Sequence, residues 1–178
     1  DGAVFTSFKD DEHGGDTNND GQDTLPATGD WDGIYFKESI ESRLENAIVR
    51  YAGRIHESST YSFPSYTNGA VKVEGGEVAI ENSTIESSQS EGLWIINSSP
   101  EINNVIFLNN NSASGASMAV FVEDENSAPE ITNSSFIGNK LGILIQNGAG
   151  PEITGNIFEE NETPIRVMSA YPVFAGNS

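Results

Sequence analysis

The chain has 178 residues, with 27 Asp and Glu against 8 Lys and Arg, and its formal net charge is −19. Nucleic acids and anionic membranes attract clustered Lys and Arg, so this charge disfavours both as partners. The length suits a single domain over residues 1–178, and the hydrophobic share of 36% favours an elongated fold with much surface for each residue. No apolar run approaches the ~18 residues that span a bilayer, and there is no cysteine, so neither membrane insertion nor disulfides are expected.

A first short strand is predicted at residues 3–5, and an acidic insertion follows over residues 10–32 with eight carboxylates and no Lys or Arg. Its central run places oxygen ligands at alternate positions and a glycine at Gly21, where a calcium loop turns sharply. We therefore predict calcium as a cofactor. The candidate ligands are Asp16, Asn18, Asp20, Gln22 and Asp23.

This run resembles the first half of an EF-hand-type or dockerin-type loop, but position twelve is Ala27 instead of a bidentate Glu. The missing ligands must then come from elsewhere, and the nearest carboxylates are Asp10, Asp11, Asp30 and Asp32. A solvated acidic loop without an ion is the alternative, because unpartnered like charges repel one another. His13 could join a transition-metal site, although a surface histidine is the simpler interpretation.

A six-residue phrase recurs along the rest of the chain: an aliphatic residue is followed five positions later by Ile, Val or Phe. The copies begin at Leu44, Ile80, Ile102, Ile131, Ile153 and, cut short, Val173. Their spacings of 36, 22, 29, 22 and 20 residues predict a solenoid of about seven coils, in which each turn of chain stacks on the next.

Short apolar strands precede most copies. If Ile34, Val71, Leu93, Val120, Ile143 and Ile165 point inward, the next residue of each strand points outward. Asn46, Asn82, Asn104 and Asn133 lie two positions after the anchors, where Asn tolerates a left-handed bend and can bond to the Asn of the adjacent coil. A second Asn column follows at Asn110, Asn139 and Asn161.

One segment allows another interpretation. Over residues 37–51, Ile40, Leu44 and Ile48 are spaced four apart, as on an amphipathic helix. The repeat favours strands here, because Leu44 begins a copy of the phrase.

The stacked Asn columns, together with the phrases Pro100-Glu-Ile102, Pro129-Glu-Ile131 and Pro151-Glu-Ile153, resemble the right-handed parallel β-helix proteins of the pectate-lyase-like superfamily, especially those with NosD-like repeats. The resemblance covers essentially the whole chain. It implies an all-β, right-handed parallel β-helix solenoid, with the calcium-loop-like insertion near its N-terminus. That scaffold hosts lyases, hydrolases, adhesins and filaments, so the resemblance leaves the function open.

We expect a non-catalytic structural or adhesive module at the cell surface, because the chain is acidic, free of cysteine and rich in Asn, Ser, Thr and Gly. No capping helix is visible at either end, which indicates either an excised piece of a longer protein or end-to-end self-association. The alternative is a carbohydrate-active enzyme of the polysaccharide lyase type, using Arg50, Arg54 or Lys72 with calcium, or a carbohydrate-binding module. The column Glu101, Glu130 and Glu152 is expected to be repeat-encoded surface.

A second candidate site is an outward stripe of Tyr35, Trp94, Phe121 and Leu144, interrupted by Lys72 and followed by Arg166. Aromatic faces stack on sugars and apolar stripes mark interfaces, so the stripe predicts contact with a surface polysaccharide or with another protein. A shift of register would instead turn Trp94 inward. An insertion over residues 54–69, with Tyr61, Phe63 and Tyr66, could border this stripe.

Overall fold

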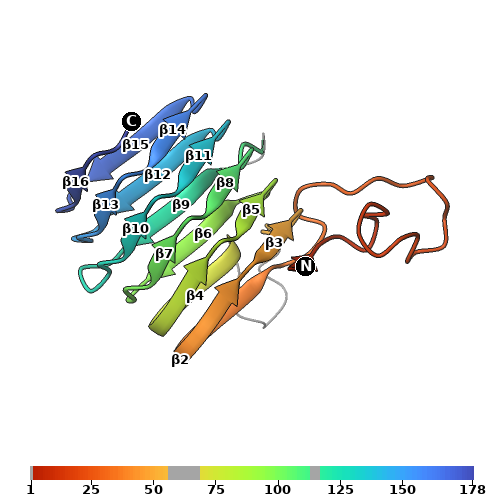
Figure 1. Cartoon of the computed structure of the whole chain (residues 1–178), viewed down its shortest axis with the longest axis horizontal. Coiled ribbons are helices and arrows are strands. Elements are labelled where there is room, and N and C mark those ends of the chain that lie inside the picture. The colour runs from red at the N-terminus through yellow and green to blue at the C-terminus, as the bar shows by residue number, and fades with distance from the viewer. Residues whose placement is uncertain (1, 56–68, 113–116) are drawn as a thin grey trace.

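The computed structural model describes residues 2–55, 69–112 and 117–178 (Figure 1). In these residues every regular element is a β-strand, and all strand pairs are parallel. The described part of the chain contains no helix long and apolar enough to cross a membrane. His56 and the aromatic residues Tyr61, Phe63 and Tyr66 of the expected insertion lie outside the described residues.

The strands form three faces that the chain visits in turn. Face 1 contains the first halves of β2 (Ile34–Glu45) and β4 (Gly69–Glu81), then β6 (Glu91–Ile96), β9 (Met118–Glu123), β12 (Leu141–Gln146) and β15 (Thr163–Met168). Face 2 contains the second halves of β2 and β4, then β7 (Glu101–Asn103), β10 (Glu130–Thr132), β13 (Glu152–Thr154) and β16 (Val173–Ala175).

Face 3 is a separate six-stranded sheet made of β1 (Ala3–Phe5), β3 (Ala47–Arg50), β5 (Thr84–Glu86), β8 (Ile106–Leu108), β11 (Ser135–Ile137) and β14 (Ile157–Glu159). Faces 1 and 2 belong to one ten-stranded sheet, because β2 and β4 run across the corner between them. The chain therefore winds as a parallel β-helix. Face 3 has six levels, where the sequence predicted about seven coils.

The inward residues of face 1 stack as the alternation predicts. Ile34, Val71, Leu93, Val120, Ile143 and Ile165 are paired in successive strands. Leu93 and Ile95 are completely buried while Trp94 between them is partly exposed, so the inward register for Trp94 is excluded. The helix alternative for residues 37–51 is also excluded, because this segment forms β2 and β3.

The repeat anchors line the interior of face 2, where Leu44, Ile80, Ile102, Ile131 and Ile153 are in register. The expected sixth anchor was wrong by one position, because Ile153 is paired with Phe174 and Val173 is paired with Glu152. Inside face 3, the rings of Phe107, Phe136 and Phe158 stack with centroids 4.9 and 4.7 Å apart.

Asparagines stabilise the corners. Asn46, Asn82, Asn104 and Asn133 have φ of 52, 50, 55 and 49°, the left-handed region predicted for them. The Asn104 amide donates to Asn82 Oδ1 at 2.8 Å, whereas Asn133 donates to Asn103 at 3.0 Å. In the second column, Asn110 donates to Asn139 at 3.1 Å and Asn139 to Asn161 at 2.9 Å.

Candidate functional site

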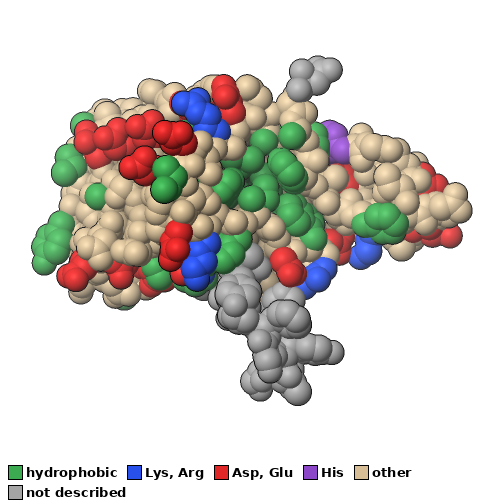
Figure 2. Space-filling model, turned by 90° about the horizontal axis from the view of Figure 1, so that it is seen from below, with side chains coloured by type: hydrophobic (Ala, Val, Ile, Leu, Met, Phe, Trp, Pro, Cys, Tyr) green, Lys and Arg blue, Asp and Glu red, His purple; other side chains and the backbone are tan. Residues whose placement is uncertain are grey.

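The acidic loop leaves the stack between β1 and β2 and projects from it (Figure 1). Acidic side chains gather at the far end of this projection (Figure 2). The turn predicted around Gly21 is formed, because the Asp16 carboxylate accepts hydrogen bonds from the backbone N–H groups of Asp20 and Gly21, both at 3.0 Å. Gly21 has φ of 74° and Asn19 of 58°, a conformation that Gly and Asn adopt most readily.

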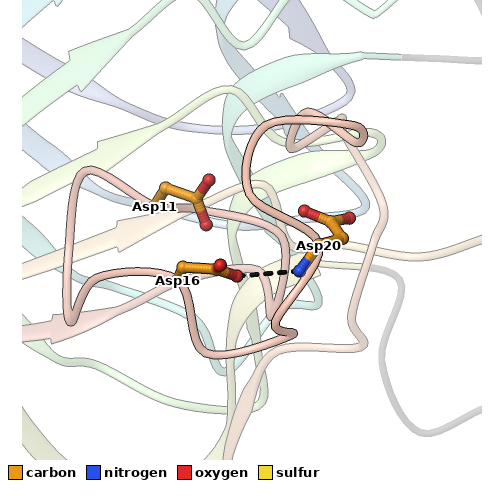
Figure 3. Close-up of side chains that lie close together, drawn as sticks. All are labelled: Asp11, Asp16 and Asp20. Carbon is orange, nitrogen blue, oxygen red and sulfur yellow. Dashed lines mark hydrogen bonds between the residues drawn. The ribbon is translucent and has the colours of Figure 1, made fainter.

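The loop brings three carboxylates together. Oxygen atoms of Asp11, Asp16 and Asp20 all lie within 4.8 Å of one another (Figure 3). Burial and the neighbouring carboxylates of Asp16, Asp20 and Asp10 raise the pKa of Asp11. Without a cation, this arrangement brings three like charges close together.

Two carboxylate oxygens of this cluster are buried without a hydrogen-bond partner, Asp11 Oδ1 and Asp20 Oδ1. Oδ1 of the neighbouring Asp10, whose side chain is 1% exposed, is also buried and accepts no hydrogen bond. An unpartnered buried carboxylate oxygen is costly, and ligation of a cation removes that cost. The described group offers oxygen atoms alone and no histidine, which is the donor set of a hard divalent cation such as Ca²⁺.

The other expected ligands take different positions. Asn18 lies beside the cluster, with its amide N–H donating to Asp20 Oδ2 at 2.9 Å, while Gln22 and Asp23 are exposed and outside the group. Asp32 pairs with Arg54 at 3.3 Å. Asp30 accepts hydrogen bonds from Ser7, Lys9 and the N–H of Ala27, and these bonds lower its pKa although burial opposes the effect.

Arg50 joins the loop to the β-helix. Its guanidinium lies 3.1 Å from Glu86, 3.3 Å from Glu12 and 3.8 Å from Asp10, and its side chain is 14% exposed. It also donates to the Tyr51 hydroxyl at 2.6 Å. Asp10, next to the cluster of Asp11, Asp16 and Asp20, is thus in the same ionic network as Arg50 at the end of β3.

The outward stripe on face 1 is in the predicted register, with Tyr35, Lys72, Trp94, Phe121, Leu144 and Arg166 on successive strands. The Lys72 ammonium lies 4.2 Å from the centre of the Trp94 ring and 5.2 Å from that of Tyr35. On the following coil, the Phe121 ring is stacked on Trp94 with centroids 5.9 Å apart and planes 18° apart.

Lys72 and Phe121 come from the coils on either side of Trp94, so they cover its two ring faces. Trp94 therefore presents its ring edge to solvent, and not a free face on which a sugar stacks. The side chains of the stripe form a ladder along the outside of the β-helix that resembles the internal stacks of the core.

Carboxylates flank this ladder. Glu74 accepts a hydrogen bond from Tyr35 at 2.5 Å and pairs with Lys72 at 3.1 Å, and these contacts lower its pKa. Glu123 accepts a hydrogen bond from the Trp94 indole at 3.0 Å. Burial, with some repulsion from Glu123, raises the pKa of Glu91 to about 7, and Glu91 Oε2 is buried without a hydrogen bond.

Sequence reasoning did not single out these three glutamates. Glu74 and Glu123 lie two residues after Lys72 and Phe121, so strand alternation would have placed them on the same side. Strand alternation does not place Glu91 on this side, because Gly92 and Leu93 are both buried and the inward–outward alternation is interrupted there.

The basic residues considered for the alternative, a lyase, do not converge. Arg50 is in the network at the end of β3 on face 3, and Lys72 is in the ladder on face 1. Arg54 pairs with Asp32 and donates to the carbonyl groups of Gly29 and Asp30. The column Glu101, Glu130 and Glu152 is in register and exposed, as expected of a repeat-encoded surface.

Parallel strands wound in three faces around stacked aliphatic and Asn columns define a repeat solenoid of the β-helix class. The family model described as the right-handed beta helix region matches residues 32–178, and the chain belongs to this family. No curated protein and no solved structure matches the chain.

Proposed function

We propose that this chain is a non-catalytic β-helix module, stabilised by calcium, that serves in structure or adhesion at the cell surface. The observation that carries this proposal is the buried, unpartnered carboxylate oxygens of Asp10, Asp11 and Asp20 in the acidic loop. Calcium accepts six to eight oxygen ligands, so Asp11, Asp16 and Asp20 would hold it, with Asp10 beside them. Backbone carbonyl groups and water would complete the shell.

In this proposal the ion has a structural role. It neutralises the densest negative charge of the chain and fixes the loop against β3 through Asp10 and Arg50. Calcium sites of modest affinity operate in extracellular modules, where the free ion is abundant.

Thermal unfolding of the whole chain tests the proposal. Calcium at ~100 times its Kd adds about 2.7 kcal/mol to the free energy of unfolding, and chelator removes that gain. Magnesium at the same concentration serves as the control for a general ionic effect. Identical melting temperatures in calcium, magnesium and chelator would overturn the proposal.

The stacked inward residues of faces 1 and 2 are exposed at the last coil, and this supports end-to-end contact between copies as one mode of assembly. Val167 and Phe174 continue the apolar columns of faces 1 and 2, yet they are 43% and 46% exposed. A coil of a second copy, or a further coil of a longer chain, would cover them equally well. Concentration-dependent light scattering tests this contact, and a molecular mass that stays monomeric at all concentrations would contradict it.

A carbohydrate-active role has less support. The ring faces of Trp94 are covered by Lys72 and Phe121, and the cationic groups of Arg50, Arg54 and Lys72 are each paired with carboxylates in separate places. Incubation with uronate polysaccharides provides the test. The appearance of unsaturated products would favour the lyase over the structural module.

A further inference from the structure

The outer surface of face 3 carries a column of side chains that no function discussed above uses. Strand pairing places one outward residue of each of the six strands in register, in the order Val4, Ile48, Thr84, Ile106, Ser135 and Ile157. Ile106 and Ile157 are 42% and 43% exposed, and the other four are partly exposed. Figure 1 shows the strands β3, β5, β8, β11 and β14 as successive rungs.

This column contains no charge, in a chain whose formal net charge is −19. The corresponding surface of face 2 carries the exposed carboxylates of Glu101, Glu130 and Glu152. The outer surface of face 1 carries the charged residues Lys72, Glu123 and Arg166. Two copies of so acidic a chain would repel each other over most of their surfaces, and the described column of face 3 is where they repel least.

The five levels of the column from Ile48 to Ile157 are symmetric about Ile106, and Val4 lies one level beyond Ile48. On either side of Ile106 comes a hydroxyl residue, Thr84 or Ser135, and then an isoleucine, Ile48 or Ile157. Neighbouring strands are evenly spaced by about 4.8 Å, so reversing the order of the levels superposes aliphatic on aliphatic and hydroxyl on hydroxyl. A two-fold interface requires a surface that is complementary to itself in this way.

We propose that a second copy of this chain packs on face 3, sheet against sheet, about a two-fold axis that runs parallel to the strands through Ile106. Ile106 then lies opposite the partner's Ile106, Ile48 opposite the partner's Ile157, and Thr84 opposite the partner's Ser135. Two sheets packed in this way lie about 10 Å apart. This contact goes beyond the proposed function and does not depend on its calcium site.

The neighbouring outward column fits the same arrangement. Leu108 of β8 lies on the level of the axis and faces the partner's Leu108. One level away, Ile137 lies opposite the partner's Glu86, whose charge is paired with Arg50 of its own chain at 3.1 Å. At the two ends of these five levels the reversal brings Arg50 opposite the partner's Glu159, which has the opposite charge. The contact therefore has an apolar residue on the axis and charged residues away from it, of which Arg50 and the partner's Glu159 attract each other.

Substitution on the axis gives a sharp test, because each copy meets the same residue of its partner there. We expect Ile106→Glu alone and Ile106→Lys alone to raise the dimer dissociation constant at least tenfold, since each places like charges together. An equimolar mixture of the two variants restores the dimer, because Glu then meets Lys. Sedimentation equilibrium measures all three, and thermal melting verifies that each variant is folded.

Cross-linking provides an independent measurement, because the chain has no cysteine of its own. A short bismaleimide is expected to join two copies of Ile106→Cys efficiently. It should join Thr84→Cys to Ser135→Cys in a mixture, at least tenfold more than either variant to itself. The control is Ile40→Cys, at a residue that is 75% exposed on the bend between faces 1 and 2.

A wild-type chain that stays monomeric to millimolar concentration would overturn the proposal. So would a dimer that tolerates both charged substitutions at position 106, and that outcome would favour the end-to-end contact instead. Neither result bears on calcium, whose effect on melting is measured separately. Failure of this inference is therefore distinguishable from failure of the proposed function.

Discussion

Arg50 and Glu86 are paired across the neighbouring strands β3 and β5, with 3.1 Å between Nε and Oε1 and with their side chains only 14% and 17% exposed. The same guanidinium reaches Asp10 and Glu12 of the acidic loop. One side chain therefore links the regular stack of strands to the irregular segment that holds the candidate metal site. This link is more exposed than a core ion pair, so its contribution is expected to be moderate.

Arg50→Met tests this link. We expect a loss of about 2 kcal/mol in the free energy of unfolding, below the range for fully buried pairs because solvent still reaches the site. A double-mutant cycle with Glu86→Gln measures the coupling, for which about 1 kcal/mol is expected. Additive effects of the two substitutions would show that the pair contributes nothing specific.

Asp11→Asn is expected to have opposite effects with and without calcium. In chelator the variant should melt higher than the wild type, because one of three crowded carboxylates is neutralised. In calcium it should bind the ion at least tenfold more weakly and gain little stability. Asp23→Asn is the matched control, since Asp23 is exposed and outside the cluster. If both variants respond to calcium equally, the ligand group is wrong.

Glu91 predicts a pH dependence of stability. Burial raises its pKa from 4.5 to about 7 in the folded state, so the folded chain binds the proton more tightly than the unfolded chain. This stabilisation is complete below pH ~4.5 and is lost as the pH rises through 7, a total of about 3 kcal/mol. Glu91→Gln should remove this dependence, whereas Glu101→Gln, on the exposed column, should retain it. Chemical denaturation between pH 4 and 9 gives the comparison.

Substitution at the centre of the buried Asn column, Asn110, Asn139 and Asn161, is expected to lower the free energy of unfolding strongly. Asn139 accepts hydrogen bonds from the backbone N–H and side-chain amide of Asn110, and donates to the carbonyl of Phe107. Asn139→Leu leaves these groups unpartnered, and we expect a loss of about 3 kcal/mol in denaturant unfolding. Asn111→Leu, at an exposed position with one amide bond to Gly138, should cost less than about 1 kcal/mol. Equal losses would contradict a structural role for the column.

Much of the fold was predictable because its determinants are local and repeated. Alternation placed Val71, Leu93 and Val120 inside, and the tolerance of Asn for positive φ placed the corners at Asn82 and Asn104. In the truncated last copy the predicted inward anchor was wrong by one residue, since no following phrase distinguishes Val173 from Phe174. Pairing with β13 shows that the anchor is Phe174.

The sites were less predictable, because their residues meet through the path of one irregular loop and through the stacking of the coils. The spacing of Asp16 and Asp20 indicated a calcium-type turn, but only the path of the loop brings Asp11 to them and separates Asp23. Likewise, the outward direction of Trp94 follows from strand period, whereas the cover on its faces depends on neighbouring coils.

The sequence by itself determined the strands, their inward columns and the acidity of one loop, because backbone preference and side-chain period act within a few residues. The tertiary structure alone decided which carboxylates crowd together, which ring faces stay free and which five levels of an outer column are symmetric about Ile106. The carboxylate cluster depends on how one loop folds back on itself. The other two properties depend on distances between coils 20 or more residues apart in the chain, which stacking fixes and local sequence does not.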